Sequence, residues 1–187
     1  MPITLFSLAC HGYSSYFLNI CSKSPTPAQC ASLDTAGLSA ANNATNVINF
    51  LRGDRSYEVS VSSPKQPFRT RASVLGDIVN ASPVFVGAPP FDYADSGYNT
   101  HKSDYASRTR MVYAAANDGL LHAFMADGDS SGAELWAFAP TAVLPNLYKL
   151  VDTNYANAHQ YYVDGSPVVG DVYDSTNSRW PKLQYHG

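Results

Sequence analysis

The stretch that decides the fold is residues 110–124, which read RMVYAAANDGLLHAF. Two apolar runs flank the turn Asn117-Asp118-Gly119, and an Asp-Gly turn between apolar runs is the strongest short-range signal for a β-hairpin. A second turn, DGDSSG at residues 127–132, leads into the apolar run ELWAF at 134–138. The sequence therefore predicts three successive antiparallel strands connected as a meander.

A short motif on the N-terminal side of this meander returns near the end of the chain. Residues 81–87 read ASPVFVG, and residues 165–171 read GSPVVGD. One repeat unit then runs from residue 81 to Phe138, and a second begins near Tyr162. We expect each unit to be a four-stranded antiparallel sheet, and radial repetition of such sheets is the architecture of a β-propeller. The predicted fold class is all-β: a partial β-propeller with about one blade and the start of the next, preceded by a short helix.

The predicted helix lies before the repeats. Ser39 is placed as its N-cap and Gly53 as its C-terminal stop. Between them, apolar residues recur with helical spacing at Ala40, Ala44, Val47, Ile48 and Leu51.

We divide the chain into three regions. Residues 1–38 are a poorly defined N-terminal segment, and residues 39–72 are the helix and an irregular connector. Residues 73–187 are the partial propeller, truncated within its second blade. Inside the propeller, we expect residues 91–107 to be a long polar loop that carries several Asp and Tyr.

Composition excludes some function classes. The formal net charge of −3 lacks the basic footprint of a nucleic-acid binder. No apolar run approaches the ~18 residues of a membrane helix. No Lys or Arg precedes the apolar stretch 3–9, so the sequence predicts no secretory signal peptide.

The cysteines Cys10, Cys21 and Cys30 allow at most one internal disulfide; Cys21 and Cys30 are closest in sequence, and the pairing stays open.

Several further motifs stand in order along the chain. They read FLRGDRS at 50–56, FRTR at 68–71, LGDIVNASPV at 75–84, VYAAANDGLLHAF at 112–124, ELWAF at 134–138, NL at 146–147 and YVDGSP at 162–167. Together they resemble the propeller region of the PilC/PilY type IV pilus proteins over about residues 46–180. Residues 181–187 read PKLQYHG and depart from that family's pattern of a strand and a glycine-rich stretch. We therefore expect a partial reading frame.

The resemblance implies a role in pilus assembly, surface adhesion and twitching motility, and no enzyme activity. It implies export to the cell surface or pilus, with pilus subunits and a host or abiotic surface as partners. It implies calcium in full-length family members and no cofactor in this part of the chain. Two alternatives stay open. One is a blade of a quinoprotein-dehydrogenase-like propeller, and the other is an extracellular scaffold without its own ligand.

Residues Arg52, Gly53 and Asp54 form an Arg-Gly-Asp tripeptide, the sequence that integrins recognise. In the resembled family, such a segment is linked to host-cell adhesion. The alternative interpretation is structural, because Gly53 and Arg52 also suit a helix end and Asp54 suits a cap of the next turn. The sequence leaves both interpretations open.

The turn at 127–132 also resembles the beginning of a calcium loop. Oxygen ligands stand at its first, third and fifth positions, Asp127, Asp129 and Ser131, and Gly132 is at the sixth. Phe138 occupies the twelfth position, where such loops carry a bidentate Glu, so Glu134 is the candidate fourth ligand. A plain hairpin loop is the alternative. No histidine has zinc spacing, and His122 is expected to have a structural role.

Overall fold

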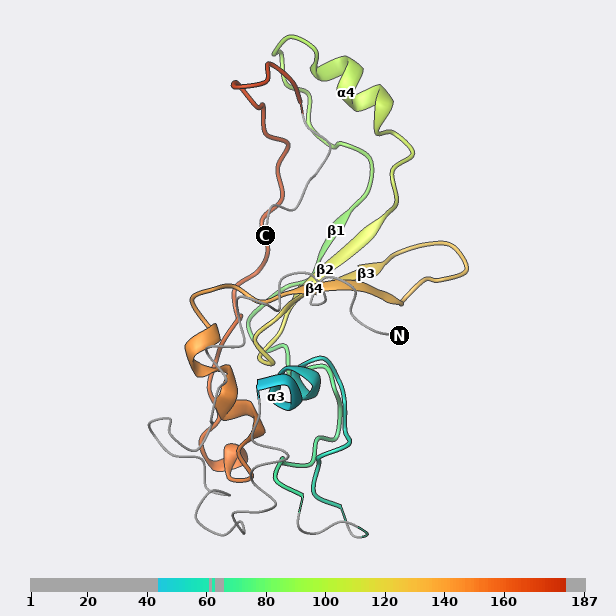
Figure 1. Ribbon diagram of the computed structural model, residues 1–187. Helices are drawn as coiled ribbons and strands as arrows, with labels where there is room; N and C mark the ends of the chain where they lie inside the picture. The colour runs from blue at the N-terminus through green and yellow to red at the C-terminus, as the bar shows by residue number, and fades with distance from the viewer. Residues whose placement is uncertain (1–43, 61, 63–65, 181–187) are drawn as a thin grey trace.

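The computed structural model describes residues 44–60, 62 and 66–180 (Figure 1). Its elements in chain order are the helix α3 (Ala44–Leu51), the strand β1 (Val84–Val86), the helix α4 (Tyr98–Asp104), the strands β2 (Met111–Ala115), β3 (Leu121–Met125) and β4 (Glu134–Phe138), and the 3-10 helices η3 (Leu144–Val151) and η4 (Tyr155–Asn157).

The strands form one antiparallel sheet in the order β1-β2-β3-β4. β2 and β3 pair from Met111↔Met125 to Ala115↔Leu121, so the Asn117-Asp118-Gly119 turn closes this hairpin. Gly119 has a φ of 88°, a left-handed conformation that glycine adopts without steric cost. The predicted four-stranded antiparallel unit is confirmed, with this turn between its second and third strands.

The two faces of the sheet carry different side chains. One face, here named the Trp136 face, carries a buried cluster of Val86, Met111, Tyr113, Ala123 and Trp136. Side chains alternate along a strand, so Phe85 and its cross-strand partner Val112 lie on the opposite face, here named the Phe85 face.

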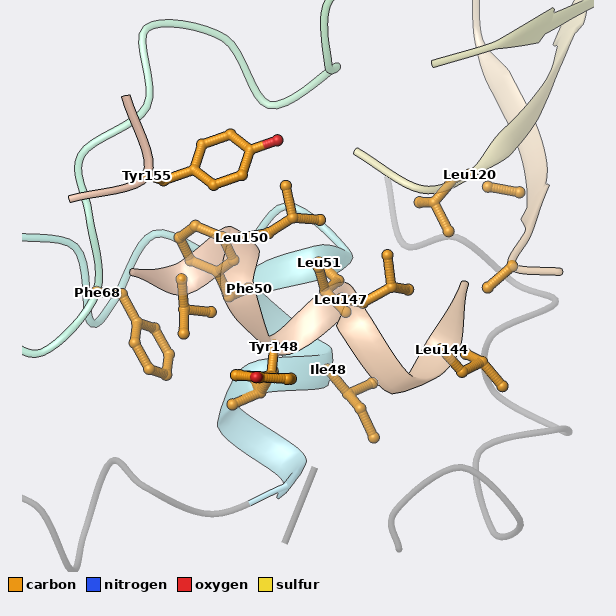
Figure 2. Packing of buried hydrophobic residues seen from close by; sticks show 14 residues of the cluster. Ile48, Phe50, Leu51, Phe68, Leu120, Leu144, Leu147, Tyr148, Leu150 and Tyr155 are labelled. Atoms are coloured by element: carbon orange, nitrogen blue, oxygen red, sulfur yellow. The ribbon is translucent and has the colours of Figure 1, made fainter. Parts of the chain in front are cut away.

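A second apolar core lies beside the sheet, between α3 and η3 (Figure 2). Figure 2 shows side chains of both helices gathered there, together with Leu120 from the hairpin turn. Of the predicted stripe, Val47, Ile48 and Leu51 are buried in this core, as expected for an amphipathic helix, whereas Ala40 and the side chain of Ala44 lie outside the described part of the chain. The expected N-cap Ser39 lies outside the described residues. The core thus fixes the helix end against the β2–β3 turn.

The prediction of a long loop over residues 91–107 was wrong in part, because α4 lies within it. Gly97 precedes this helix with a φ of 81°, and Tyr98 and His101 are its buried residues. Their partner is remote in sequence: the Tyr98 ring meets Trp180 edge-on, with ring centroids 4.7 Å apart. Tyr98 also packs on Tyr93 and donates to Asp171 Oδ2 at 2.7 Å. A helix held by such single contacts leaves no apolar period in its own sequence, so pattern reasoning missed it.

A substitution at the hairpin turn tests this packing. Gly119 and Gly128 both have positive φ, 88° and 76°, so alanine at either position carries a backbone penalty of roughly 1–2 kcal/mol. A Cβ at Gly119 would lie 2.2 Å from Leu147 Cδ2, whereas a Cβ at Gly128 meets nothing within 4 Å. We expect Gly119→Ala to lose a further ~1–3 kcal/mol through overpacking. Urea unfolding followed by Trp fluorescence measures this difference, and equal midpoints for the two variants would contradict it.

Candidate functional site

The Arg-Gly-Asp tripeptide forms the C-terminal cap of α3. Gly53 has a φ of 103°, its N–H donates to the Phe50 carbonyl at 2.9 Å, and the Asp54 N–H donates to the Asn49 carbonyl at 2.9 Å. These two bonds constitute a Schellman motif, which satisfies carbonyls that the helix end leaves free. The helix-end role expected of Gly53 is therefore present in the structure.

The Asp54 carboxylate is exposed and forms a local turn. Its Oδ1 accepts hydrogen bonds from the Ser56 N–H at 2.7 Å and the Ser56 hydroxyl at 2.6 Å. The side-chain and backbone hydrogen bonds from Ser56 lower the pKa of this carboxyl. Asp54 therefore presents a charged carboxylate at the surface, held in one orientation by its neighbour.

A buried ion pair supports the backbone around the tripeptide. The Nε of Arg71 lies 2.6 Å from Glu58 Oε1, and its two terminal nitrogens donate to the carbonyls of Phe50 and Asp54 at 2.7 and 2.8 Å. The guanidinium also stacks 3.6 Å from the Phe50 ring centroid. A buried arginine whose charge is paired and whose nitrogens donate to the backbone fixes local geometry, and here it holds the carbonyls of Phe50, in α3, and of Asp54, the last residue of the tripeptide. The sequence showed the Phe-Arg-Thr-Arg motif but not this contact.

The candidate calcium ligands are not brought together around one point. Asp127 forms an ion pair with Arg110, with Oδ2 and Nε 3.6 Å apart, and Glu134 Oε1 lies 2.6 Å from His122 Nδ1. Asp129 and Ser131 are exposed in the hairpin loop. Among residues 44–60, 62 and 66–180, no three His, Cys, Asp or Glu side chains are grouped to hold a metal ion. Calcium at this loop would require both partnered carboxylates to move.

Asn117 is the polar residue that joins the two repeats, and sequence reasoning identified it as a turn residue alone. It is 2% exposed. Its N–H donates to the Asp77 carbonyl and its Nδ2 to Asp77 Oδ2, both at 3.0 Å. Its Oδ1 accepts the Tyr162 N–H at 3.1 Å. One buried amide thus links the residues that precede the first and second Ser-Pro-Val motifs.

Asp118 in the turn and His122 in β3 are in contact through their side chains. Asp118 Oδ2 accepts the Gly76 N–H at 2.8 Å, and His122 Nε2 lies 3.1 Å from both Asp118 oxygens. Burial by itself lowers the pKa of the His122 imidazole, but hydrogen bonds and charges from Asp118 and Glu134 outweigh burial and raise this pKa to about 9. An imidazolium that keeps its proton at neutral pH is a poor general base, in agreement with the structural role expected for His122.

The two Ser-Pro-Val motifs lie side by side, and we name their contact the repeat junction. The Ser82 N–H donates to Ser166 Oγ at 2.9 Å, and these are equivalent residues of the two repeats, 84 positions apart. The Asn80 N–H donates to Asp164 Oδ1 at 3.1 Å. Val169 packs against the Trp136 face. The repeat junction therefore joins the segments that open the two repeats, ahead of β1 in the first.

A family comparison agrees with this arrangement. Residues 75–185 match the family model described as the PilY1 beta-propeller domain. The chain belongs to the PilY1 β-propeller family. This finding confirms the resemblance seen in the sequence motifs. The sheet described above is then one blade of such a propeller. The segment from Asp164 repeats the motif that precedes β1, but the strands expected of the second repeat are not formed within the described residues 162–180, where Asp174 and Arg179 form an isolated bridge.

Curated relatives carry the PilY1 name. The chain is 42% identical over 142 residues to a type IV pilus biogenesis factor PilY1 homolog of Xylella fastidiosa, covering 72% of this chain and 11% of the relative. It is 45% identical over 135 residues to the type IV pilus biogenesis factor PilY1 of Pseudomonas aeruginosa strain PAK, covering 67% of this chain and 11% of the relative. The chain therefore spans about a tenth of the length of these PilY1 proteins. No solved structure matches the chain. Among its described helices, none is long and apolar enough to cross a membrane.

The charge on His122 makes the stability of this PilY1-family blade depend on pH. The folded-state pKa of about 9 lies above the ordinary value of 6.5, so the stabilisation is complete below pH 6.5 and is lost as pH rises through 9. We expect the unfolding free energy to fall over this window by up to roughly 3 kcal/mol. His122→Gln should remove this decrease. Urea midpoints of the wild-type chain and of His122→Gln, measured from pH 6 to pH 10, test this prediction. The same dependence of the midpoint on pH in both chains would contradict it.

Proposed function

We propose that this chain is a blade-forming part of a propeller that serves type IV pilus biogenesis by binding other proteins. The proposal is supported by membership of the PilY1 β-propeller family and by relatives named as pilus biogenesis factors. The proposed location is the pilus or cell surface, and the proposed partners are pilus subunits.

The observation that carries this proposal is the repeat junction. The hydrogen bond between the equivalent residues Ser82 and Ser166 supports it, because this bond joins the two Ser-Pro-Val motifs. Each blade must then bury its faces on its neighbours, because a single four-stranded unit cannot close a core. A chain built in this way supplies a scaffold and a rigid surface for protein contacts.

Binding rather than turnover is also the function that the polar groups favour. His122, the buried histidine of the hairpin, keeps a raised pKa between two carboxylates and stabilises the turn. In the quinoprotein-dehydrogenase-like alternative, the cofactor would lie on the axis of a closed ring, contacted by many blades. Fold similarity to such enzymes does not transfer their chemistry.

We extend the proposal to surface attachment through Arg52-Gly53-Asp54. The Asp54 carboxylate is exposed, and Arg71, paired with Glu58, holds the backbone carbonyls of Phe50 and Asp54. A fixed turn loses little conformational entropy on binding, which favours recognition. The proposed target is a host or abiotic surface, and attachment through the pilus would also contribute to twitching motility.

A chimaera tests the proposed function. In P. aeruginosa strain PAK, the segment of PilY1 that matches this chain would be exchanged for residues 44–180. We expect surface pili and twitching close to those of the parent strain, because the substituted blade keeps the repeat junction. Pili are counted by shearing and electron microscopy. A chimaera exported at the parental level that leaves the cells without pili would contradict the proposal.

Two substitutions in this chimaera separate attachment from assembly. Asp54→Glu alters the tripeptide and displaces the carboxylate from the hydrogen bonds that Ser56 donates. Ser56→Ala removes the same bonds but keeps Arg-Gly-Asp intact. We expect Asp54→Glu to reduce attachment to host cells about tenfold, as for loss of one hot-spot residue, with Ser56→Ala near the unsubstituted chimaera and pilus number equal in all three. Equal attachment by both variants would contradict a role of Arg52-Gly53-Asp54 in attachment, and would leave the proposed role in pilus assembly untouched.

A further inference from the structure

A buried polar cluster lies where the connection between β1 and β2 meets the second repeat. Tyr98 and His101 of α4, together with Arg108, come from this connection, and Asp171 comes from the second repeat. The side chains of His101 and Asp171 are each 4% exposed, and that of Arg108 is 12% exposed. Figure 1 shows α4 beyond the ends of β1 and β2, so the cluster belongs to the end of the sheet.

Three side chains converge on the Asp171 carboxylate, and their contacts with it are unequal. The Tyr98 hydroxyl donates to Oδ2 at 2.7 Å. His101 Nε2 and Arg108 Nη1 lie 3.7 and 4.0 Å from Oδ1, which is too far for a hydrogen bond. Asp171 thus occupies the centre of the cluster without satisfying the two nitrogen donors.

The same two side chains carry further nitrogen atoms without a partner. Among the residues that the structure describes, neither ring nitrogen of His101 has a hydrogen-bond partner, and Nη2 of Arg108 has none. The Nε of Arg108 donates to the Gly87 carbonyl, which fixes the guanidinium in place. Buried polar groups in folded proteins are nearly always paired. The cluster is therefore arranged for an acceptor whose oxygens reach further than those of Asp171.

The segment that supplies Asp171 is anchored at its two ends, and we name residues 171–180 the strap. At the far end, the Trp180 ring stacks on Tyr93 with centroids 5.6 Å apart, and its indole N–H donates to the Ser96 carbonyl at 3.1 Å. Residues 175–179 between the anchors are exposed. The Asp171 end can therefore open by breaking its hydrogen bond with Tyr98, while the intervening residues give up little burial.

We propose that Tyr98, His101 and Arg108 form a binding site for an oxyanion, and that Asp171 is the built-in competitor for this site. A guanidinium binds carboxylate and phosphate groups through two parallel hydrogen bonds, a geometry that Asp171 does not reach here. When the strap opens, an external oxyanion takes the place of the Asp171 carboxylate and pairs with the donors that Asp171 leaves unpaired. The site shares no residue with Arg52-Gly53-Asp54 or with the repeat junction.

The experiment uses the full chain of residues 1–187 and empties the site by Asp171→Ala. Asp174→Ala is the matched control, because Asp174 is the other carboxylate of the strap and lies 3.9 Å from Arg179 within the strap itself. A double variant, Asp171→Ala with Arg108→Gln, also removes the guanidinium. Thermal midpoints are measured in sodium phosphate, acetate and chloride at equal ionic strength and pH, since a ligand of the folded chain raises the midpoint.

We expect Asp171→Ala to gain about 3–6 °C over chloride at an oxyanion concentration ten times the dissociation constant. A gain in acetate alone identifies the ligand as a carboxylate, and a gain in phosphate alone identifies it as a phosphate group. Asp174→Ala and the double variant should show no such gain. Far-UV circular dichroism checks that all variants fold alike.

The wild-type chain provides a test without substitution. The indole N–H signal of Trp180 in nuclear magnetic resonance spectra reports on the strap. We expect it to shift saturably with the same oxyanion, with an apparent affinity about tenfold weaker than that of Asp171→Ala, because Asp171 competes. Three results would overturn the proposal: no gain for Asp171→Ala over chloride, an equal gain in the double variant, or a wild-type Trp180 signal that responds to chloride and oxyanions alike.

Discussion

The side-chain amide of Asn117 is the interaction on which the rest of the structure depends. It is buried in the turn of the central hairpin, where it donates to Asp77 and accepts from Tyr162. An amide left unpaired in such a position costs about 1–3 kcal/mol, which is a large fraction of the stability of a small domain. The hairpin, the start of the first repeat and the start of the second are therefore positioned by one residue.

Around this turn, a close backbone approach and two ion pairs restrict the conformation of the chain. A Cβ on Gly76 would lie 2.3 Å from the Asp118 backbone nitrogen, so the segment that leads into the first repeat approaches the turn as closely as glycine permits. The imidazolium of His122 lies between Asp118 and Glu134 and ties the turn to β4. The turn is therefore joined to β4, and through Gly76 to the segment that leads into the first repeat.

The elements that could be predicted from sequence are those whose cause is local. The hairpin follows from turn residues next to apolar runs, and the end of α3 follows from Gly53 in a left-handed conformation. The repeat was visible as a second Ser-Pro-Val motif. The helix α4 could not be predicted, because two of the partners of its buried Tyr98, Asp171 and Trp180, are far away in sequence. The role of Asn117 depends likewise on partners that only the fold brings near, and the Arg71–Glu58 pair that supports Arg52-Gly53-Asp54 has the same tertiary origin.

Residue-resolved hydrogen exchange of Asn117→Ala tests this account most directly. Three backbone amides report on the repeat junction: Tyr162 donates to Asn117 itself, whereas Asn80 and Ser82 donate to Asp164 and Ser166. The account predicts that the substitution removes protection from all three amides, while amides within β2 and β3 keep theirs. Loss of protection at Tyr162 with Asn80 and Ser82 unchanged would show that the repeats hold together without this turn, and would contradict the account.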